Sequence, residues 1–141
     1  MADYRGECHC GAIGYVYRCA AAPADWAIRA CQCRFCRAHD ALSASDPAAT
    51  ISFFATEPGR LQPYRFGLQT ADFLVCRQCG VYIGASIETP KGRFGIINTH
   101  ALVDPAPAIA RPQPISYDGE ETDDRVTRRE ERWAPVTGFP E

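Results

Sequence analysis

The spacing of the eight cysteines constrains this chain more than any other feature of its sequence. Cys8/Cys10 and Cys31/Cys33 are pairs separated by one residue, and a mutual disulfide at that spacing is strained. In extended backbone the same spacing directs both side chains to one face, where they can grip a single ion. These pairs therefore favour metal binding over a disulfide framework.

A third pair, Cys76 and Cys79, has the two-residue spacing of a zinc knuckle, and Gly80 follows where such a turn often needs a positive φ. The economical partition joins the two outer pairs into one site and leaves the central run as a second site. Four thiolates saturate tetrahedral zinc and predict a structural site, whereas three leave a position for water or substrate, as in catalytic zinc. The predicted groups are Cys8, Cys10, Cys76 and Cys79 for the first site, and Cys31, Cys33 and Cys36 for the second.

Cys19 is the one cysteine outside these groups. It could supply a fourth thiolate that closes the second site. The interpretation that we favour is a small buried apolar residue at the end of a strand, a common place for a free cysteine.

Composition and charge exclude several classes of protein. The chain has 141 residues, of which 46% are apolar, and these values fit one domain with a modest core rather than a disordered chain. A net charge of −2 argues against non-specific nucleic-acid binding. Because no apolar stretch is long enough to cross a membrane and none follows residues 1–5, we expect no membrane partner, no secretory leader and a cytoplasmic location.

The hydrophobic pattern predicts a mainly β protein with few short helices, organised as a single domain over residues 1–141. Short runs rich in aromatic and β-branched residues are bounded by Gly, Pro or Asp, as strands are. A short helical turn is predicted after Cys33, to about Ala41. Five aromatic residues are assigned to the core rather than to substrate stacking: Phe53, Phe54, Tyr64, Phe66 and Phe73. The predicted strands are Ala12–Tyr17, Trp26–Ala30, Ile51–Phe54, Leu61–Phe66, Phe73–Cys76, Val81–Ile87 and Phe94–Ile97.

A charged C-terminal arm covers about residues 118–141, with eleven charged residues between Asp118 and Arg132. Glu121/Arg125 is one pair with helical i,i+4 spacing, so a solvated helix without chemistry is expected. Trp133 could pin the arm to the body or contribute to an interface.

Three motifs together resemble the glutathione-dependent formaldehyde-activating enzyme family, which shares a superfamily with the centromere protein V homologues. They lie in the family's order within about residues 5–105, and they read Gly6-Glu7-Cys8-His9-Cys10-Gly11-Ala12, Cys31-Gln32-Cys33-Arg34-Phe35-Cys36-Arg37 and Phe73-Leu74-Val75-Cys76-Arg77-Gln78-Cys79-Gly80. The resemblance implies an Mss4-like β-tent and two zinc ions, partitioned as the spacing predicts. It also implies a carbon–sulfur lyase activity, an S-(hydroxymethyl)glutathione synthase that joins glutathione as thiol co-substrate to formaldehyde, with Cys31, Cys33 and Cys36 catalytic.

Basic and titratable residues around the central motif are candidates for supporting roles. Arg34 and Arg37 flank the predicted catalytic cysteines, and their forked side chains suit a glutathione carboxylate, although exposed arginines in contact with water would look the same in sequence. His39 and Asp40 could relay a proton, and His100 is a possible pocket residue. His9 lies between two ligands and should point away from their metal.

Two further interpretations compete with the enzyme. A zinc-stabilised, Mss4-like binding module would use both metals as scaffold and the charged arm as partner surface, since fold does not determine chemistry. A zinc-ribbon nucleic-acid binder has the metal spacing but lacks a basic surface. Ala38 and Ala41 stand where relatives often have a basic residue and a glycine, which leaves open another small aldehyde or another thiol.

Overall fold

The protein is mainly β, and its computed structural model describes residues 1–140. Within that range the chain forms two α-helices and two 3-10 turns: α1 (Arg34–Ala38), α2 (Thr122–Arg132), η1 (Pro23–Asp25) and η2 (Thr99–Ala101). The strands are β1 (Ala2–Glu7), β2 (Ile13–Cys19), β3 (Arg29–Cys31), β4 (Ser43–Ala44), β5 (Thr50–Ala55), β6 (Leu61–Tyr64), β7 (Asp72–Cys76), β8 (Tyr82–Thr89), β9 (Gly92–Asn98), β10 (Gln113–Ile115) and β11 (Ala134–Gly138).

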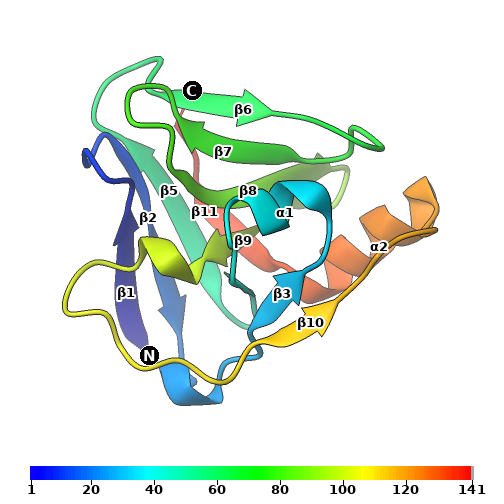
Figure 1. Ribbon diagram of the computed structural model, residues 1–141, viewed down its shortest axis with the longest axis horizontal. Helices are drawn as coiled ribbons and strands as arrows, with labels where there is room; N and C mark the ends of the chain where they lie inside the picture. The colour runs from blue at the N-terminus through cyan, green and yellow to red at the C-terminus, as the bar shows by residue number, and fades with distance from the viewer. Residues whose placement is uncertain (141) are drawn as a thin grey trace.

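All strands connect into one curved sheet that branches at β9 (Figure 1). One path runs β1-β2-β5-β11-β9-β4-β3-β10, and a second runs from β9 through β8 and β7 to β6. Most neighbours are antiparallel, whereas β11 pairs parallel to β5 and β10 pairs parallel to β3. The branch brings the C-terminal strand between segments that are distant in the sequence.

Strands β7, β8 and β9 are buried on both faces, which explains their nearly continuous apolar sequences. Because successive side chains point to opposite faces, alternate residues enter two separate cores. Leu74, Ile83 and Ile97 pack in the core shared with β2 and β5. The second core, beside α1 and the end of α2, contains Phe73, Tyr82, Ile96 and Trp133.

Most predicted strands are present with shifted ends, but the predicted strand Trp26–Ala30 is mostly wrong. Trp26 closes the η1 turn, and β3 begins only at Arg29. The Trp26 ring instead packs edge-on against Tyr4 and Tyr17, at centroid distances of 5.0 and 5.2 Å. Aromatic packing here replaces the backbone pairing that a strand would need. The strands β1, β4, β10 and β11 are not predicted from the sequence.

The charged C-terminal segment does form a helix, but it is not simply solvated. Arg125 and Arg128 both bind Glu120, at 3.0 and 2.9 Å, instead of forming the expected i,i+4 pairs. Trp133 is buried at the end of α2, and β11 then joins the sheet. The arm is therefore part of the body of the protein. Among the described residues no helix is long and apolar enough to cross a membrane.

Candidate metal centres and the cavity beside them

The sulfurs of Cys8, Cys10, Cys76 and Cys79 lie within 4.8 Å of one another, although the two pairs are far apart in sequence. The Sγ atoms of Cys8 and Cys10 are 3.7 Å apart, and those of Cys10 and Cys76 are 3.6 Å apart. Zinc–sulfur bonds of about 2.3 Å in a tetrahedron require sulfur–sulfur edges of about 3.8 Å. The four-cysteine cluster therefore has the dimensions of a tetrahedral zinc site.

Each pair lies on a tight turn that aims backbone N–H groups at sulfur. The amides of Gln78 and Cys79 donate to Cys76 Sγ at 3.3 and 3.4 Å, and the turn ends at Gly80 with φ +81°. Gly11 has the same φ after the first pair. Such amide donors stabilise thiolates, and a glycine at positive φ lets the turn close without steric cost.

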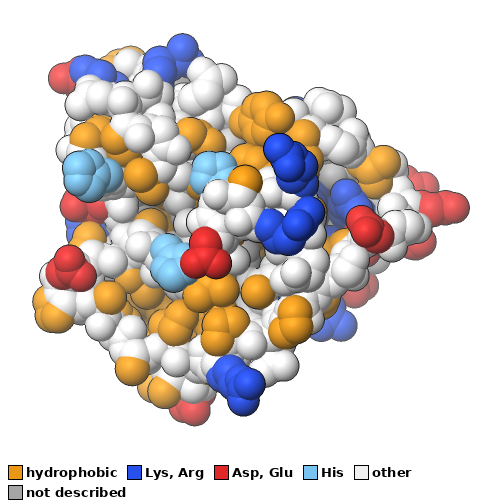
Figure 2. Space-filling model, in the orientation of Figure 1, with side chains coloured by type: hydrophobic (Ala, Val, Ile, Leu, Met, Phe, Trp, Pro, Cys, Tyr) orange, Lys and Arg blue, Asp and Glu red, His pale blue; other side chains and the backbone are white. Residues whose placement is uncertain are grey.

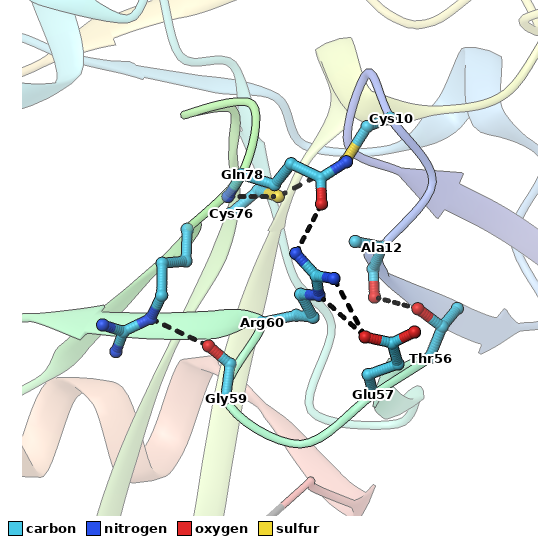
Figure 3. A network of polar contacts seen from close by, with 9 residues as sticks. Cys10, Ala12, Thr56, Glu57, Gly59, Arg60, Cys76 and Gln78 are labelled. Carbon is cyan, nitrogen blue, oxygen red and sulfur yellow. Dashed lines mark hydrogen bonds and ion pairs between the residues drawn. The ribbon is translucent and has the colours of Figure 1, made fainter.

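The β5–β6 loop ties the two turns together (Figure 3). At one end the Thr56 hydroxyl donates to the carbonyl of Ala12, just after the first turn, at 3.3 Å. At the other end Arg60 donates to Glu57, at 2.9 Å, and to the side chain of Gln78 in the second turn. This loop holds the two halves of the four-cysteine cluster in register independently of any ion.

The second cluster is local and consists of Cys31, Cys33 and Cys36, whose sulfurs also lie within 4.8 Å of one another. Cys31 ends β3, Cys33 caps α1 and accepts a hydrogen bond from the Cys36 amide at 3.4 Å, and Cys36 is buried in the helix. Within residues 1–140 no fourth His, Cys, Asp or Glu joins this cluster. Strand end and helix start together explain how three sulfurs of one short segment converge.

The two clusters lie against opposite cores of the β7–β9 region. Cys8 and Cys76 belong to the core shared with β2 and β5, whereas Cys36 belongs to the core beside α1 and α2. Two separate sites, four sulfurs and three, are the arrangement that the cysteine spacing predicts.

The protonation of the three-sulfur cluster favours a cation among its sulfurs. Hydrogen bonds from the Cys31 and Cys36 thiols lower the pKa of Cys33 to about 2, while the interactions of Cys36 with Cys31 and Cys33, together with burial, raise the pKa of Cys36. The three thiols therefore oppose one another's ionisation, and a divalent cation among them would favour the ionised form of all three. The buried Tyr82 hydroxyl has no hydrogen-bond partner, and negative charge on these cysteines adds to burial in raising its pKa. Three soft sulfur ligands fit a zinc ion with one open position, and the Tyr82 hydroxyl nearby is free to donate a hydrogen bond.

In the four-cysteine cluster the sulfurs also differ in acidity. Burial raises the pKa of Cys8 to about 12. Although burial acts in the opposite direction at Cys79, hydrogen bonds from the backbone of Cys10 and Val81 lower its pKa to about 6. Full ionisation of all four sulfurs again requires a cation, so the cluster fits a bound zinc ion.

A cavity of about 240 Å³ opens beside the three-sulfur cluster. All three cysteines line it, and Phe66, Phe73, Ile96 and Trp133 form its apolar walls. Phe66 and the buried Phe73 line this cavity, so the assignment of the five aromatic residues to the core rather than to a substrate site holds only in part. Tyr64, in contrast, is exposed.

Several residues singled out in the sequence lie elsewhere. Arg34 and Arg37 are exposed on α1 and do not line this cavity, and Arg37 Nε donates to the Gln32 carbonyl at 3.0 Å. Their role in holding a carboxylate stays a prediction. His100 Nε2 lies 3.5 Å from a carboxylate oxygen of Asp40, and neither residue lines the cavity.

His39 and Cys19 also lie apart from the three-sulfur cluster. His39 packs on the Phe35 ring at 4.5 Å between centroids and does not line the cavity. Cys19 is 1% exposed at the end of β2, outside both sulfur clusters, which confirms its assignment as a buried apolar residue.

The remaining residues of the cavity wall are not identified by the sequence patterns. Arg29 comes from β3, Tyr117 follows β10, and Arg125, Arg128 and Arg129 come from α2. The dense charge of the C-terminal arm marks the three arginines of α2, but no sequence pattern marks Arg29 or Tyr117. Local periodicity does not show that α2 packs beside β9 and borders the same cavity as β3 and α1.

Comparisons with known proteins agree with this geometry. The family described as glutathione-dependent formaldehyde-activating enzyme matches residues 3–117, most of the chain. A crystal structure of a Rhodobacter sphaeroides protein resembles the fold with a TM-score of 0.51 and 24% sequence identity, over 94% of this chain and 99% of that one. Curated proteins gave no significant match.

The matched range includes all three cysteine motifs and both sulfur clusters, and it ends before α2. The chain belongs to the glutathione-dependent formaldehyde-activating enzyme family.

Proposed function

We propose that this protein catalyses the addition of a glutathione-like thiol to formaldehyde or another small aldehyde, giving an S-hydroxymethyl-type adduct. The observation that carries the proposal is the three-sulfur cluster of Cys31, Cys33 and Cys36 on the wall of a cavity, with no fourth His, Cys, Asp or Glu joining it among residues 1–140. A purely structural site has no use for an open position beside a cavity. Membership of the family supports the thiol and the aldehyde.

Zinc bound by the three cysteines would supply a position in which an incoming thiol is held as thiolate. The sulfur then attacks the carbonyl carbon of the aldehyde, so that a carbon–sulfur bond forms and the C=O π pair moves to oxygen. The oxygen takes up the proton that the thiol released, and no oxidant or reductant is needed.

The chain's own residues contribute enclosure and orientation. Cys31, Cys33 and Cys36 fix the place of the nucleophile, and Phe66 and Phe73 exclude water from one side of it. Exclusion of water strengthens the electrostatic interactions of the reacting groups. Holding thiol and aldehyde in one small cavity also removes much of the entropic cost of bringing them together.

The four-cysteine cluster has a structural role in this proposal, which gives two zinc ions per chain. Arg34 and Arg37 remain proposed contacts for parts of a thiol substrate that extend out of the cavity. We propose a cytoplasmic enzyme of the carbon–sulfur lyase class that acts on small molecules rather than on nucleic acid or a membrane.

The test pairs zinc content with activity in protein purified under reducing conditions without added metal. Wild-type protein should contain two zinc ions per chain and accelerate adduct formation between glutathione and formaldehyde above the uncatalysed rate, followed by NMR exchange. Cys33→Ser should lose one zinc ion and the acceleration, while keeping the circular dichroism spectrum. Cys19→Ala is the matched control, because Cys19 lies outside both clusters.

Two results would refute the proposal. One is a wild-type rate in Cys33→Ser, and the other is a single zinc ion per chain that the Cys33→Ser change leaves in place. In the second case both cysteine-rich regions would serve as scaffold, and a zinc-stabilised binding module would explain the chain better.

A further inference from the structure

Four arginines meet at the cavity that holds the three-sulfur cluster: Arg29, Arg125, Arg128 and Arg129. Lys and Arg side chains gather over α1 and between α1 and α2 in Figure 2, while carboxylates lie toward the outer end of α2. We call these four arginines the basic wall of the cavity. Formaldehyde carries no charge, so it cannot form an ion pair with them. The arginines therefore point to a charge on the other substrate.

Arg129 is the most unusual of the four because it is a buried cation without a carboxylate. Its side chain belongs to a residue that is 7% exposed, and its Nε atom has no hydrogen-bond partner. Its Nη1 atom donates to Thr70 Oγ1 at 2.6 Å, and the guanidinium lies 4.8 Å from the centroid of the Trp133 ring. A buried charge with an unpaired N–H group destabilises the protein unless an anion pairs with the charge and accepts a hydrogen bond from that group.

Arg29 on strand β3 is a second cation of this wall, and it is half-buried. It donates to the Ser45 hydroxyl and forms no ion pair with any residue in the described part of the chain. Burial lowers the pKa of Arg29, and burial together with Arg128 and Arg125 lowers the pKa of Arg129 to about 10. Both groups still carry a full charge at neutral pH.

The nearby carboxylates do not neutralise this wall. Glu120 is shared between Arg125 and Arg128, to which it lies 3.0 and 2.9 Å away. Asp118 lines the cavity but is exposed and belongs to no ion pair of the described residues. Two guanidinium groups, those of Arg29 and Arg129, are thus left without an anionic partner.

We propose that Arg129, assisted by Arg29, binds the carboxylate of the thiol substrate while its sulfur reaches Cys31, Cys33 and Cys36. This rests on the proposed function for the thiol and adds the place where a carboxylate of that thiol is held. A guanidinium binds both oxygens of a carboxylate through parallel hydrogen bonds, which suits the planar fork of Arg129. Arginine and sulfur line the same cavity, so one molecule can contact both.

The size of the cavity narrows the ligand further. Pockets for drug-sized ligands measure roughly 300–1,000 Å³. The 240 Å³ found here suits a small mercapto acid or one carboxylate arm of glutathione, with the remainder outside. Arg129 lies beyond the residues 3–117 that match the family, whereas Arg29 lies within them, so the subsite joins the matched region to the segment that follows it.

Binding of capped thiols tests the subsite without relying on catalysis. Calorimetry on the zinc-loaded protein would compare S-methylglutathione with its diethyl ester, and 3-(methylthio)propionate with its methyl ester. Each methylated sulfur is a thioether that cannot form a thiolate, so the carboxylate contribution is isolated. The free acid should bind at least tenfold more tightly than its ester, the ratio expected for one charged hydrogen bond. The acid with the larger ratio identifies the source of the carboxylate.

Variants locate the effect. Arg129→Gln should weaken binding of the acid at least tenfold and leave binding of the ester unchanged, and Arg29→Gln should weaken it less. Arg132→Gln is the matched control, because it removes the same charge from an exposed position on the same helix. If Arg129→Gln fails to fold, the other two variants decide the question: a lower acid-to-ester ratio in Arg29→Gln but not in Arg34→Gln/Arg37→Gln supports the subsite, and the reverse result overturns it.

Equal affinity for acid and ester, or loss of acid binding in an Arg34→Gln/Arg37→Gln variant instead of Arg129→Gln, would overturn the assignment. The two proposals fail differently. Arg129-dependent acid binding without adduct formation supports the subsite and refutes the proposed function. Adduct formation with equal KM for glutathione and its diester refutes the subsite and leaves the proposed function standing.

Discussion

Removing two ligands from the four-cysteine cluster tests whether a metal ion closes the fold. The change is Cys10→Ser with Cys79→Ser, which leaves the buried Cys8 and Cys76 in place. Cys10 is exposed and Cys79 half-buried, so the substitutions themselves remove little packing. Two sulfurs cannot satisfy a tetrahedral ion, and the zinc should be lost.

The size of the effect follows from the length of chain that the cluster closes. Cys10 and Cys76 are 66 residues apart, and cross-linking a loop of that length stabilises a fold by about 4 kcal/mol in the chain-entropy treatment. For 141 residues the unfolding entropy near the midpoint is about 0.3 kcal/mol/K, so the melting temperature should fall by about 13 °C. The loop around Arg60 retains part of the contact between the two turns, so the native fold should persist at low temperature.

The assay is thermal unfolding by circular dichroism, with zinc content measured on the same samples. Cys19→Ala serves as the control for losing a cysteine, and it should keep its zinc and melt close to the wild-type protein. A double variant that melts with the wild-type protein, or one that keeps both zinc ions, would show that the reasoning about loop closure is wrong.

Three other changes test separate parts of the account. Cys33→Ser should lower the melting temperature far less than Cys10→Ser/Cys79→Ser does, because the three-sulfur cluster spans only residues 31–36 and serine can still cap α1. Thermal unfolding curves of the two variants, recorded under the same conditions, check this. Gly84→Ala should destabilise by about 1–3 kcal/mol, since a Cβ there would lie 2.4 Å from the Ile96 carbonyl oxygen between β8 and β9; urea unfolding measures it, and an unchanged midpoint would contradict the packing argument. Hydrogen bonds from Arg128 hold the pKa of Glu120 below its usual 4.5. This carboxylate therefore stabilises the protein above pH 4.5, and the stabilisation is lost as the pH falls through the lowered pKa. The difference in melting temperature between the wild-type protein and Glu120→Gln should shrink in acid, and a constant difference would refute the prediction.

Local chemistry was readable from the sequence because it depends on neighbours in the chain. Spacing of one and two residues between cysteines sets which neighbouring sulfurs can converge. Counting ligands then predicts the partition into Cys8/Cys10 with Cys76/Cys79 and a separate Cys31/Cys33/Cys36, which the fold brings together. The mainly β character is likewise present in short apolar runs bounded by turn residues. The prediction for Trp26 failed because aromatic packing against Tyr4 and Tyr17 outweighed its β propensity.

The cavity was decided by tertiary structure alone. Nothing in the local pattern of residues 118–132 shows that Arg129 is buried or that Arg125 and Arg128 share Glu120, since charge in a sequence predicts solvation by default. Those positions became a binding wall only when Trp133 was buried and β11 joined the sheet, which laid α2 against β3 and the three-sulfur cluster. The sequence by itself determined which atoms can hold the metals, because ligand spacing is covalent geometry. Which charged groups face the three-sulfur cluster depends on contacts between segments about ninety residues apart, and only the folded chain specifies these.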